Sequence, residues 1–191
     1  MSWEGYRFPF QEAARVRLVI FDVDGVLTDG KIRLDDAGRE HKAFDVRDGH
    51  GIKLLQRAGV QCAIITGRRS ALVERRAQEL GIAWVRQGAT NKLDALEKVL
   101  ADAGMSAEEA AFFGDDVLDV PPMRACRLGF APADAHPAVR RAADWVASFP
   151  GGRGAVRQMC EGMILAHGMW EKAIARRYGV RPEDCGWPSG R

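Results

Sequence analysis

The run from Leu18 to Phe21 is apolar throughout, and two aspartates, Asp22 and Asp24, follow it almost at once. A strand whose side chains are all apolar is buried on both faces, as in a parallel sheet that helices cover on each side. Carboxylates at the carboxyl end of such a strand lie at the edge where open α/β sheets bind ligands. This stretch therefore predicts a buried strand that presents two acids to a ligand site.

The rest of the chain alternates between strand-like and helix-like patterns. Apolar, β-rich runs occupy residues 16–23, 61–66, 110–114, 127–131 and 144–147. Amphipathic helical patterns lie between them, and three of these end at Gly59, Gly81 and Gly104. Such alternation favours a doubly wound parallel sheet with right-handed crossovers, so the predicted fold class is α/β.

One segment interrupts this alternation between the first strand and its helix. Residues 30–46 carry Asp-Ala-Gly near their centre with short apolar flanks, which indicates a small inserted β-hairpin. Since the hairpin leaves from the acidic turn itself, we expect it to form a wall of the site or an oligomer contact. We expect a single domain at 16–179, an N-terminal extension at 1–15 and a disordered tail at 180–191.

Composition excludes several classes of function. With 191 residues, 47% hydrophobic and 28% charged, the chain is typical of one globular domain. It has no apolar stretch of the roughly 20 residues that a membrane-spanning helix needs. A net charge of +2 without a basic, aromatic-rich patch argues against nucleic acid and favours a small anionic substrate.

The cysteines and the amino terminus indicate a reducing compartment. The four cysteines stand singly without a CxxC pair, so we expect free thiols rather than disulfides or a zinc site. The first residues lack the basic start and the apolar segment of a secretory signal. We therefore expect a cytoplasmic location.

Four polar signals follow in order, each near the end of a predicted strand or the start of a predicted helix. They are Asp22 with Asp24, Thr66 with Gly67, Lys92, and an acidic turn of Asp115, Asp116 and Asp119. Each signal alone is equally typical of an acidic turn, a helix cap or a surface lysine. Together they supply a carboxylate nucleophile, a proton donor, phosphate-binding groups, a cation and metal-binding acids, which are the parts that phosphoryl transfer needs.

Electrostatics suggests a role for each residue of the first three signals. An anionic aspartate approaches a phosphate dianion only when cations offset the charge, so we expect Mg²⁺ as well as Lys92. Asp22 is placed to attack phosphorus, and Asp24 to act as acid and then as base, with its proton held by neighbouring acids. The Thr66 hydroxyl and the Gly67 amide would bind phosphoryl oxygens.

The acidic turn would complete the site. Asp115 would ligate the metal, and Asp119, one helical turn further on, would orient Lys92 or complete the outer shell of the metal. Asp116, between them, is a supporting residue of the same turn.

The motifs DVDGVLTDG, ITGR, NK and GDDVLD resemble the four motifs of the haloacid dehalogenase superfamily of aspartate-nucleophile phosphatases. Longer segments, such as FDVRDGHGIKLL and GGRGAVRQMCE, are similar to the 3-deoxy-D-manno-octulosonate 8-phosphate phosphatases over residues 16–168. The resemblance implies a Rossmannoid fold without a large cap domain and magnesium-dependent hydrolysis in lipopolysaccharide sugar synthesis, through an aspartyl-phosphate. It also implies a homotetramer in which the hairpin and a neighbour's carboxyl-terminal segment close each shared site.

The resemblance implies further roles, position by position. Asp22 would be nucleophile and metal ligand, Asp24 acid/base and backbone-carbonyl ligand, and Asp115 the third ligand. The implied substrate-contacting residues are Asp24, Asp45, Val46, Arg47, Asp48, Gly49, Lys53, Gly67, Arg68, Arg76 and Lys92. Asp45 stands where relatives often carry asparagine. Arg153 and Arg157 either reach a neighbouring subunit's site or belong to a glycine turn that opens a helix.

Three alternatives stay open at this point. A phosphatase for a nine-carbon, sialic-acid-like sugar is the nearest, although Arg68 after Thr-Gly favours the eight-carbon substrate where an acidic residue would favour the other. A receiver domain of signalling proteins also has an acid cluster, a threonine and a lysine, but it lacks the inserted hairpin and this spacing of acids. The third alternative is a catalytically silent assembly subunit.

Overall fold

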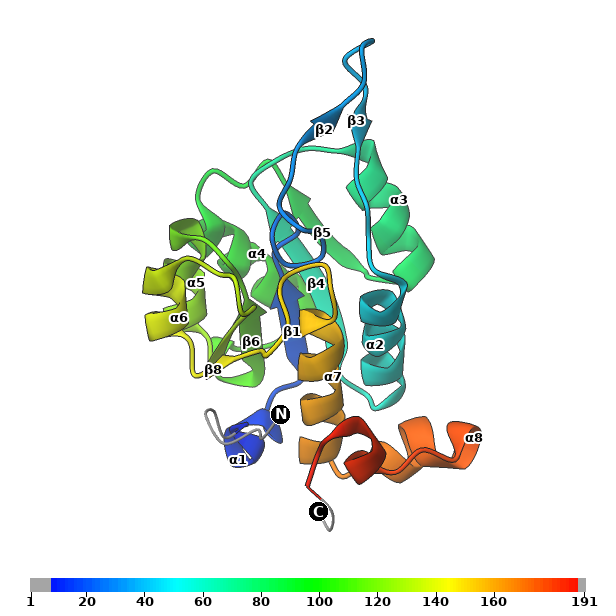
Figure 1. Cartoon of the computed structure of the whole chain (residues 1–191). Coiled ribbons are helices and arrows are strands. Elements are labelled where there is room, and N and C mark those ends of the chain that lie inside the picture. The colour runs from blue at the N-terminus through cyan, green and yellow to red at the C-terminus, as the bar shows by residue number, and fades with distance from the viewer. Residues whose placement is uncertain (1–7, 189–191) are drawn as a thin grey trace.

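Six parallel strands form the centre of the molecule, and helices cover both faces of the sheet (Figure 1). The structure is a computed structural model, and it describes residues 8–188. The strands are β1 (Leu18–Phe21), β4 (Gln61–Thr66), β5 (Trp84–Gln87), β6 (Ala110–Phe113), β7 (Leu128–Ala131) and β8 (Trp145–Val146). Their order across the sheet is β5-β4-β1-β6-β7-β8, and every neighbouring pair is parallel. The predicted doubly wound α/β sheet is thereby confirmed.

Eight helices surround the sheet in the described residues. They are α1 (Phe10–Ala13), α2 (Val46–Arg57), α3 (Ala71–Leu80), α4 (Lys92–Ala103), α5 (Val120–Ala125), α6 (Pro137–Ala142), α7 (Ala155–Ala166) and α8 (Arg176–Tyr178). Of these, α2, α3 and α4 end close to the predicted positions. Shorter 3₁₀ or π turns are η1 (Ala107–Glu109), η2 (Val117–Asp119), η3 (Glu171–Ala175) and η4 (Pro182–Cys185). Gly81 and Gly104 end α3 and α4 in the left-handed conformation that glycine adopts without strain.

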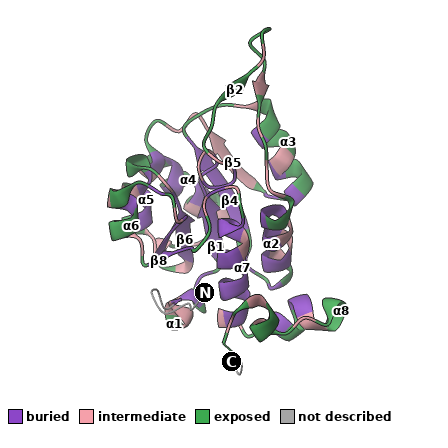
Figure 2. Cartoon of the chain, in the orientation of Figure 1, coloured by how far each residue is buried: buried purple, intermediate pink, exposed green. Residues whose placement is uncertain are grey.

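Alternate residues of each strand supply the two halves of the core. Val19 and Phe21 of β1 pack with α2, α3 and α7, whereas Leu18 and Ile20 pack with α4, α5 and α6. Figure 2 shows the buried residues gathered in the sheet and on the inward sides of these helices. Because both faces are covered, the carboxyl ends of the strands are the part of the sheet that is open to a ligand.

The insertion between β1 and α2 is a hairpin of β2 (Arg33–Leu34) and β3 (Glu40–His41), paired antiparallel. It projects beyond the helices at the upper edge of the molecule in Figure 1. Ile32 and Leu34 are about two-thirds exposed on it. All residues between β1 and α2 are described, and they form this hairpin and no larger cap, as predicted.

The carboxyl-terminal segment differs from the predicted disordered tail. Residues 180–188 form η4 and fold back on the domain, where the Trp187 ring packs against Phe8 and Phe10. Trp187 Nε1 also donates to Glu161 Oε2 at 3.0 Å, and Trp170 Nε1 to the Val180 carbonyl at 2.9 Å. The prediction is wrong for these residues because single tryptophans hold the segment, and such contacts leave no periodic pattern. Residues 189–191 lie outside the described residues.

The amino-terminal extension is described from Phe8 onward, and its α1 packs on α7. Residues 1–7 lie outside the described part. Among residues 8–188, no helix combines the length and the apolar character needed to cross a bilayer.

Candidate active site

Asp22 follows β1 directly and lies at the carboxyl edge of the sheet. Its backbone N–H donates to the Phe113 carbonyl at 2.9 Å, which extends the pairing of β1 with β6 by one residue. The residue is only 6% exposed. Burial disfavours the charged carboxylate and raises the pKa of Asp22 to about 6. The nucleophile candidate is therefore held in a fixed backbone position in a desolvated environment.

Lys92 faces Asp22 from the first turn of α4. Asn91 caps this helix by accepting the amides of Leu93 and Asp94. The buried Lys92 Nζ lies 3.0 Å from Asp22 Oδ1 and 2.6 Å from Asp119 Oδ1. Burial opposes the charge of the ammonium, but the two carboxylates outweigh it and raise the pKa of Lys92. The unfavourable position of a cation at a helix start is thus compensated by two acids.

The acidic turn after β6 is organised by Asp119. Asp119 Oδ2 accepts the amides of Asp115 and Asp116 at 3.0 and 3.2 Å, while Oδ1 accepts from Lys92. Asp116 caps η2 by accepting the Val117 amide at 2.7 Å. Both oxygens of the fully buried Asp119 are therefore occupied, so this residue holds Lys92 and the turn together.

Asp115 is the acid of this turn whose carboxylate is left available. Burial, followed by the charges of Asp22 and Asp119, raises the pKa of Asp115 to about 8. Its buried Oδ1 has no hydrogen-bond partner among the described residues. A Cβ atom at Gly25 would lie 2.1 Å from Asp115 Oδ2, so the glycine allows the turn after β1 to reach this carboxylate.

These acids fit a hard divalent cation. Oxygens of Asp22, Asp115 and Asp119 lie within 4.8 Å of one another. Since Asp119 is committed to Lys92 and two amides, Asp22 and Asp115 are the side chains that would hold Mg²⁺, which favours one or two carboxylates with waters and phosphate. The buried Asp115 oxygen without a hydrogen-bond partner is suited to ligate such a cation.

We expect Mg²⁺ to stabilise the protein more at high pH than at low pH. The raised pKa of Asp115, about 8 against 3.8, gives a stabilising contribution that is complete below about pH 4 and lost as the pH rises through about 8. Mg²⁺ binds the ionised form, so its effect on the melting temperature should grow between about pH 6 and about pH 8. Thermal unfolding with Mg²⁺ or with chelator measures this. Asp115→Asn should abolish the response, whereas exposed Asp102→Asn should keep it; an equal response at both pH values would contradict the expectation.

Thr66 and Gly67 reach the same edge from the neighbouring strand. β4 pairs with β1 in the register Phe21↔Ile64, so Thr66, the last residue of β4, lies near the level of Asp22 and the residues after it. Thr66 is 2% exposed, and its carbonyl accepts the Ala89 amide at 3.0 Å. The predicted phosphate-binding pair is therefore fixed by its backbone beside the acids.

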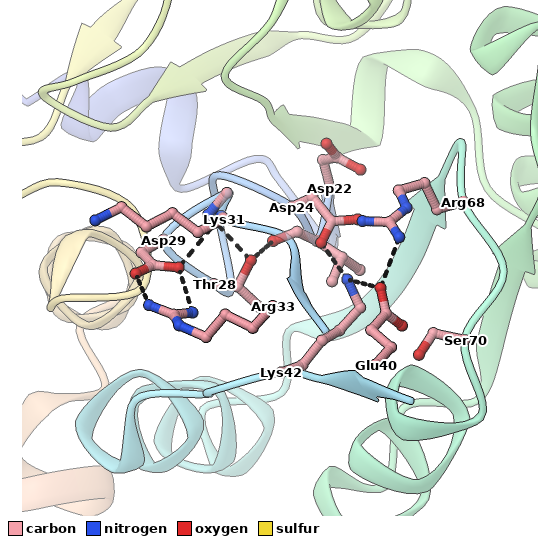
Figure 3. A network of polar contacts seen from close by, with 12 residues as sticks. Asp22, Asp24, Thr28, Asp29, Lys31, Arg33, Glu40, Lys42, Arg68 and Ser70 are labelled. Carbon is pink, nitrogen blue, oxygen red and sulfur yellow. Dashed lines mark hydrogen bonds and ion pairs between the residues drawn. The ribbon is translucent and has the colours of Figure 1, made fainter. Parts of the chain in front are cut away.

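Asp24 contacts a lysine that the sequence interpretation did not include. Figure 3 shows Lys42, which follows β3 of the hairpin, pointing at Asp24. Lys42 Nζ donates to Asp24 Oδ1, and the Lys42 side chain is only 3% exposed. The sequence pattern placed only other acids beside Asp24, whereas the structure adds an ammonium group that the inserted hairpin brings there. The sequence signal that could have identified Lys42 was a lysine within the segment that starts at the acidic turn.

Arg68 joins this group through Glu40. Arg68 Nη2 donates to Glu40 Oε1 at 2.7 Å, and Lys42 Nζ lies 3.6 Å from the same oxygen (Figure 3). The order of charges from the turn outward is therefore Asp24, Lys42, Glu40 and Arg68. The hairpin thus brings charged side chains beside the acids, which is compatible with the first of the two roles expected for this insert.

The other predicted substrate residues gather at the start of α2. Asp45 caps the helix and pairs with Arg47, whose Nη2 lies 2.7 Å from Asp45 Oδ2. Val46 between them is 80% exposed. Gly49 makes room for Arg76, because a Cβ there would lie 2.1 Å from Arg76 Nη2.

Asp48 and Lys53 have other surroundings than the predicted substrate site. The Asp48 carboxylate is buried and accepts the Gly154 amide at 3.2 Å and the Arg157 amide at 2.8 Å, so it caps α7. Lys53 Nζ lies beside Gly81, at the carboxyl-terminal end of α3 and away from the strand ends. The structure thus gives Asp48 a capping role that local sequence does not indicate, because its partners are more than 100 residues away in the sequence.

The glycine turn before α7, residues 151–154, packs directly on the loop that carries Asp22 and Asp24. Gly152 N–H donates to the Val26 carbonyl at 2.8 Å, and a Cβ at Gly151 would lie 1.8 Å from the Gly25 carbonyl oxygen. Arg153 of this turn and Arg157 of α7 line, with Arg47, a cavity of about 140 Å³. The turn therefore supports the loop that carries Asp22 and Asp24.

Comparison with known proteins agrees with this geometry. The family model of the haloacid dehalogenase-like hydrolases matches residues 46–127. The 3-deoxy-D-manno-octulosonate 8-phosphate phosphatase KdsC of Escherichia coli K12 is 46% identical over 162 residues, 85% of this chain and 86% of that protein.

Solved structures are similar over the same extent. The crystal structure of the Yersinia pestis phosphatase of that name has a TM-score of 0.83 and 46% identity, covering 85% of this chain and 88% of that one. The Moraxella catarrhalis phosphatase, solved with magnesium, phosphate and KDO, has a TM-score of 0.85 and 39% identity, covering 88% and 97%. The chain therefore belongs to the 3-deoxy-D-manno-octulosonate 8-phosphate phosphatase family of haloacid dehalogenase-like hydrolases.

Proposed function

We propose that this chain hydrolyses 3-deoxy-D-manno-octulosonate 8-phosphate to the free sugar acid and phosphate, with Mg²⁺, in lipopolysaccharide sugar synthesis. The observation that carries the proposal is the group of buried Asp22 and Lys92 with half-buried Asp115 at the sheet edge, in a chain 46% identical to phosphatases of that name. Arg68, directly after Thr66 and Gly67, supports a substrate that carries a carboxylate as well as a phosphate.

The residues at the edge divide the reaction into two displacements. An Asp22 carboxylate oxygen attacks phosphorus, the bond from phosphorus to the sugar oxygen breaks, and Asp24 gives that oxygen its proton. Water then attacks the aspartyl-phosphate, Asp24 takes the proton of the water, and phosphate leaves. Lys42 occupies Oδ1 of Asp24 and leaves Oδ2 to exchange the proton.

The remaining groups bind the phosphoryl oxygens and balance their charge. The Thr66 hydroxyl and the Gly67 amide donate to the oxygens, and the Lys92 ammonium offsets their negative charge. Asp22, Asp115 and the Asp24 carbonyl would hold Mg²⁺, whose positive charge would offset the negative charges of the nucleophile and the phosphate. Asp119 keeps Lys92 in place through the 2.6 Å contact.

A phosphate-release assay tests the substrate. We expect the highest kcat/KM for 3-deoxy-D-manno-octulosonate 8-phosphate, a lower value for a nine-carbon sialic-acid-like 9-phosphate, and the lowest for p-nitrophenyl phosphate. Activity should require Mg²⁺ and disappear with chelator. Equal values for the eight-carbon substrate and the simple ester would reject the substrate and leave the phosphatase chemistry standing.

We also propose a cytoplasmic homotetramer whose subunits share their active sites. The exposure of Ile32 (63%) and Leu34 (62%) on the hairpin and of Val46 (80%) at the start of α2 supports apolar contacts with another copy. The four free cysteines support a reducing compartment.

We expect Leu34→Asp to dissociate the tetramer, because it places a charge in the proposed apolar contact. Light scattering should then give a smaller mass, together with a lower kcat/KM. Ala101→Asp, which adds the same negative charge on the exposed side of α4, should keep the mass of the wild type. A Leu34→Asp protein of unchanged mass would remove the hairpin from the interface.

A further inference from the structure

Arg68 stands at the outer end of a line of alternating charges that begins in the catalytic turn. Lys42 contacts Asp24 on one side and approaches Glu40 on the other, and Glu40 Oε1 accepts from Arg68 Nη2 at 2.7 Å (Figure 3). These residues come from three separate segments: the turn after β1, the hairpin, and the loop between β4 and α3. Glu40 is the residue that connects the hairpin to the β4–α3 loop.

Glu40 is itself held firmly. A hydrogen bond from the Ser70 hydroxyl, at the start of α3, lowers the pKa of Glu40, as do the charges of Lys42 and Arg68. The Glu40 side chain is 20% exposed and the Lys42 side chain 3% exposed, so the carboxylate lies against the protein rather than in open solvent. A carboxylate that accepts from the guanidinium at 2.7 Å and lies 3.6 Å from an ammonium is a stable anchor for Arg68.

Arg68 keeps most of its donors while it is anchored. Only Nη2 is engaged with Glu40, the side chain is 42% exposed, and a guanidinium has five N–H donors in a rigid plane. Without the anchor, a long side chain on an exposed loop would occupy many rotamers, and ordering it would weaken binding. With the anchor, the remaining donors are presented next to Thr66 and Gly67 in one orientation.

We propose that Glu40 is a positioning residue that orients Arg68 to bind the carboxylate of the sugar acid, and thereby sets specificity against phosphate esters without a carboxylate. The inference rests on the proposed function and deepens it. Glu40 acts through Arg68 and does not touch the reacting atoms. Glu40 could instead compete with the substrate carboxylate for Arg68. Its removal would then lower KM, whereas removal of a positioning residue raises KM, so the direction of the change in KM separates the two roles.

Steady-state kinetics of Glu40→Gln tests this inference. Glutamine keeps the shape and can still accept from Ser70, but it removes the charge that holds Arg68. We expect KM for 3-deoxy-D-manno-octulosonate 8-phosphate to rise about tenfold, as for the loss of one charge-assisted hydrogen bond, with kcat changed less than about twofold. Both constants for p-nitrophenyl phosphate should stay as in the wild type. Glu40→Asp should restore part of the affinity.

Two further variants make the test specific. Arg68→Ala should raise KM for the sugar acid phosphate, and adding Glu40→Gln to it should raise KM no further, because Glu40 acts through Arg68. Glu108→Gln breaks an ion pair of the same 2.7 Å length with Arg127 on the exposed surface, and it should behave as wild type.

The outcomes separate this inference from the proposed function. A wild type that treats both substrates alike overturns the substrate and the inference together. A wild type that prefers the sugar acid phosphate, beside a Glu40→Gln variant with unchanged or lower KM, overturns the inference alone. Equal losses on both substrates, or an added loss in the double variant, also overturn it, because Glu40 would then act on the fold or independently of Arg68.

Discussion

Asp22→Asn is expected to lower kcat by at least about 10⁴-fold while the protein stays folded. The substitution keeps the size of the side chain but removes the oxygen nucleophile that would form the aspartyl-phosphate. The other carboxylates of the site are engaged elsewhere: both oxygens of Asp119 are occupied, Asp24 is paired with Lys42, and Asp115 belongs to a different strand end. Phosphate release with Mg²⁺ measures the loss, and mass spectrometry after an acid quench shows whether a phosphoprotein forms.

The same substitution should stabilise the protein without metal. Burial raises the pKa of Asp22 from 3.8 to about 6, so its contribution to stability is present at low pH and is lost as the pH rises through about 6. Asparagine carries no charge to desolvate, so at about pH 8 the variant should gain on the order of 2 kcal/mol in free energy of unfolding, and near pH 4 it should gain little. Urea unfolding in the presence of chelator measures both values.

The decisive feature of this prediction is that kcat falls while the free energy of unfolding rises. A variant that loses activity because it is misfolded would be less stable at both pH values. Asp24→Asn is the matched comparison, since it changes an acid of the same loop that is paired with Lys42 and does not remove the nucleophile. Its phosphoprotein should form from p-nitrophenyl phosphate, whose leaving group needs little protonation, and should hydrolyse slowly. A phosphoprotein in Asp22→Asn would refute Asp22 as the nucleophile.

Local sequence patterns predicted the elements of the fold correctly where a strand is buried along its whole length. The apolar run of β1 predicted a central parallel strand, and the glycines after α3 and α4 marked the helix ends because they adopt the left-handed conformation. β5 (Trp84–Gln87) was not predicted, since it is a half-buried edge strand that contains Arg86 and Gln87. Its pairing with β4 gives stability that no local pattern records.

The sequence predicted which residues meet at the carboxyl edge of the sheet, because parallel strands bring their carboxyl ends together. This rule gathers Asp22, Thr66 and Asp115, whereas Lys92 joins them through α4, which follows the unpredicted β5. The rest of the site depends on tertiary structure. The hairpin that brings Lys42 and Glu40 to the edge is oriented by its contacts with other segments of the chain. No local sequence pattern specifies such an orientation.

Lys92→Met is expected to have the second large effect, and here stability and activity should fall together. Lys92 Nζ lies between Asp22 and Asp119, whose side chains are 8% and 0% exposed. Methionine fills similar volume but leaves two carboxylates buried without their cation. Removing one partner of a buried pair costs about 3–5 kcal/mol, so the melting temperature should fall clearly when chelator is present.

Mg²⁺ should recover part of that stability and little of the activity. Asp22 and Asp115 would hold the metal, which would offset the charge of Asp22. Asp119 would stay bound to the amides of the acidic turn, without its ammonium partner. Turnover should stay lower by on the order of 10³-fold, the effect of losing one fixed positive group that faces the transferring phosphoryl oxygens.

Lys98→Met is the matched control for this prediction, since it makes the same change on the exposed side of the same helix. It should alter neither the melting temperature nor kcat. A further variant, Lys92→Met with Asp119→Asn, removes the acid that the first substitution leaves unpaired, so it should regain stability without regaining turnover. If the double variant regained turnover instead, Lys92 would serve the fold and not the phosphoryl group. Recovery of stability alone is the result that the geometry of this buried triad requires.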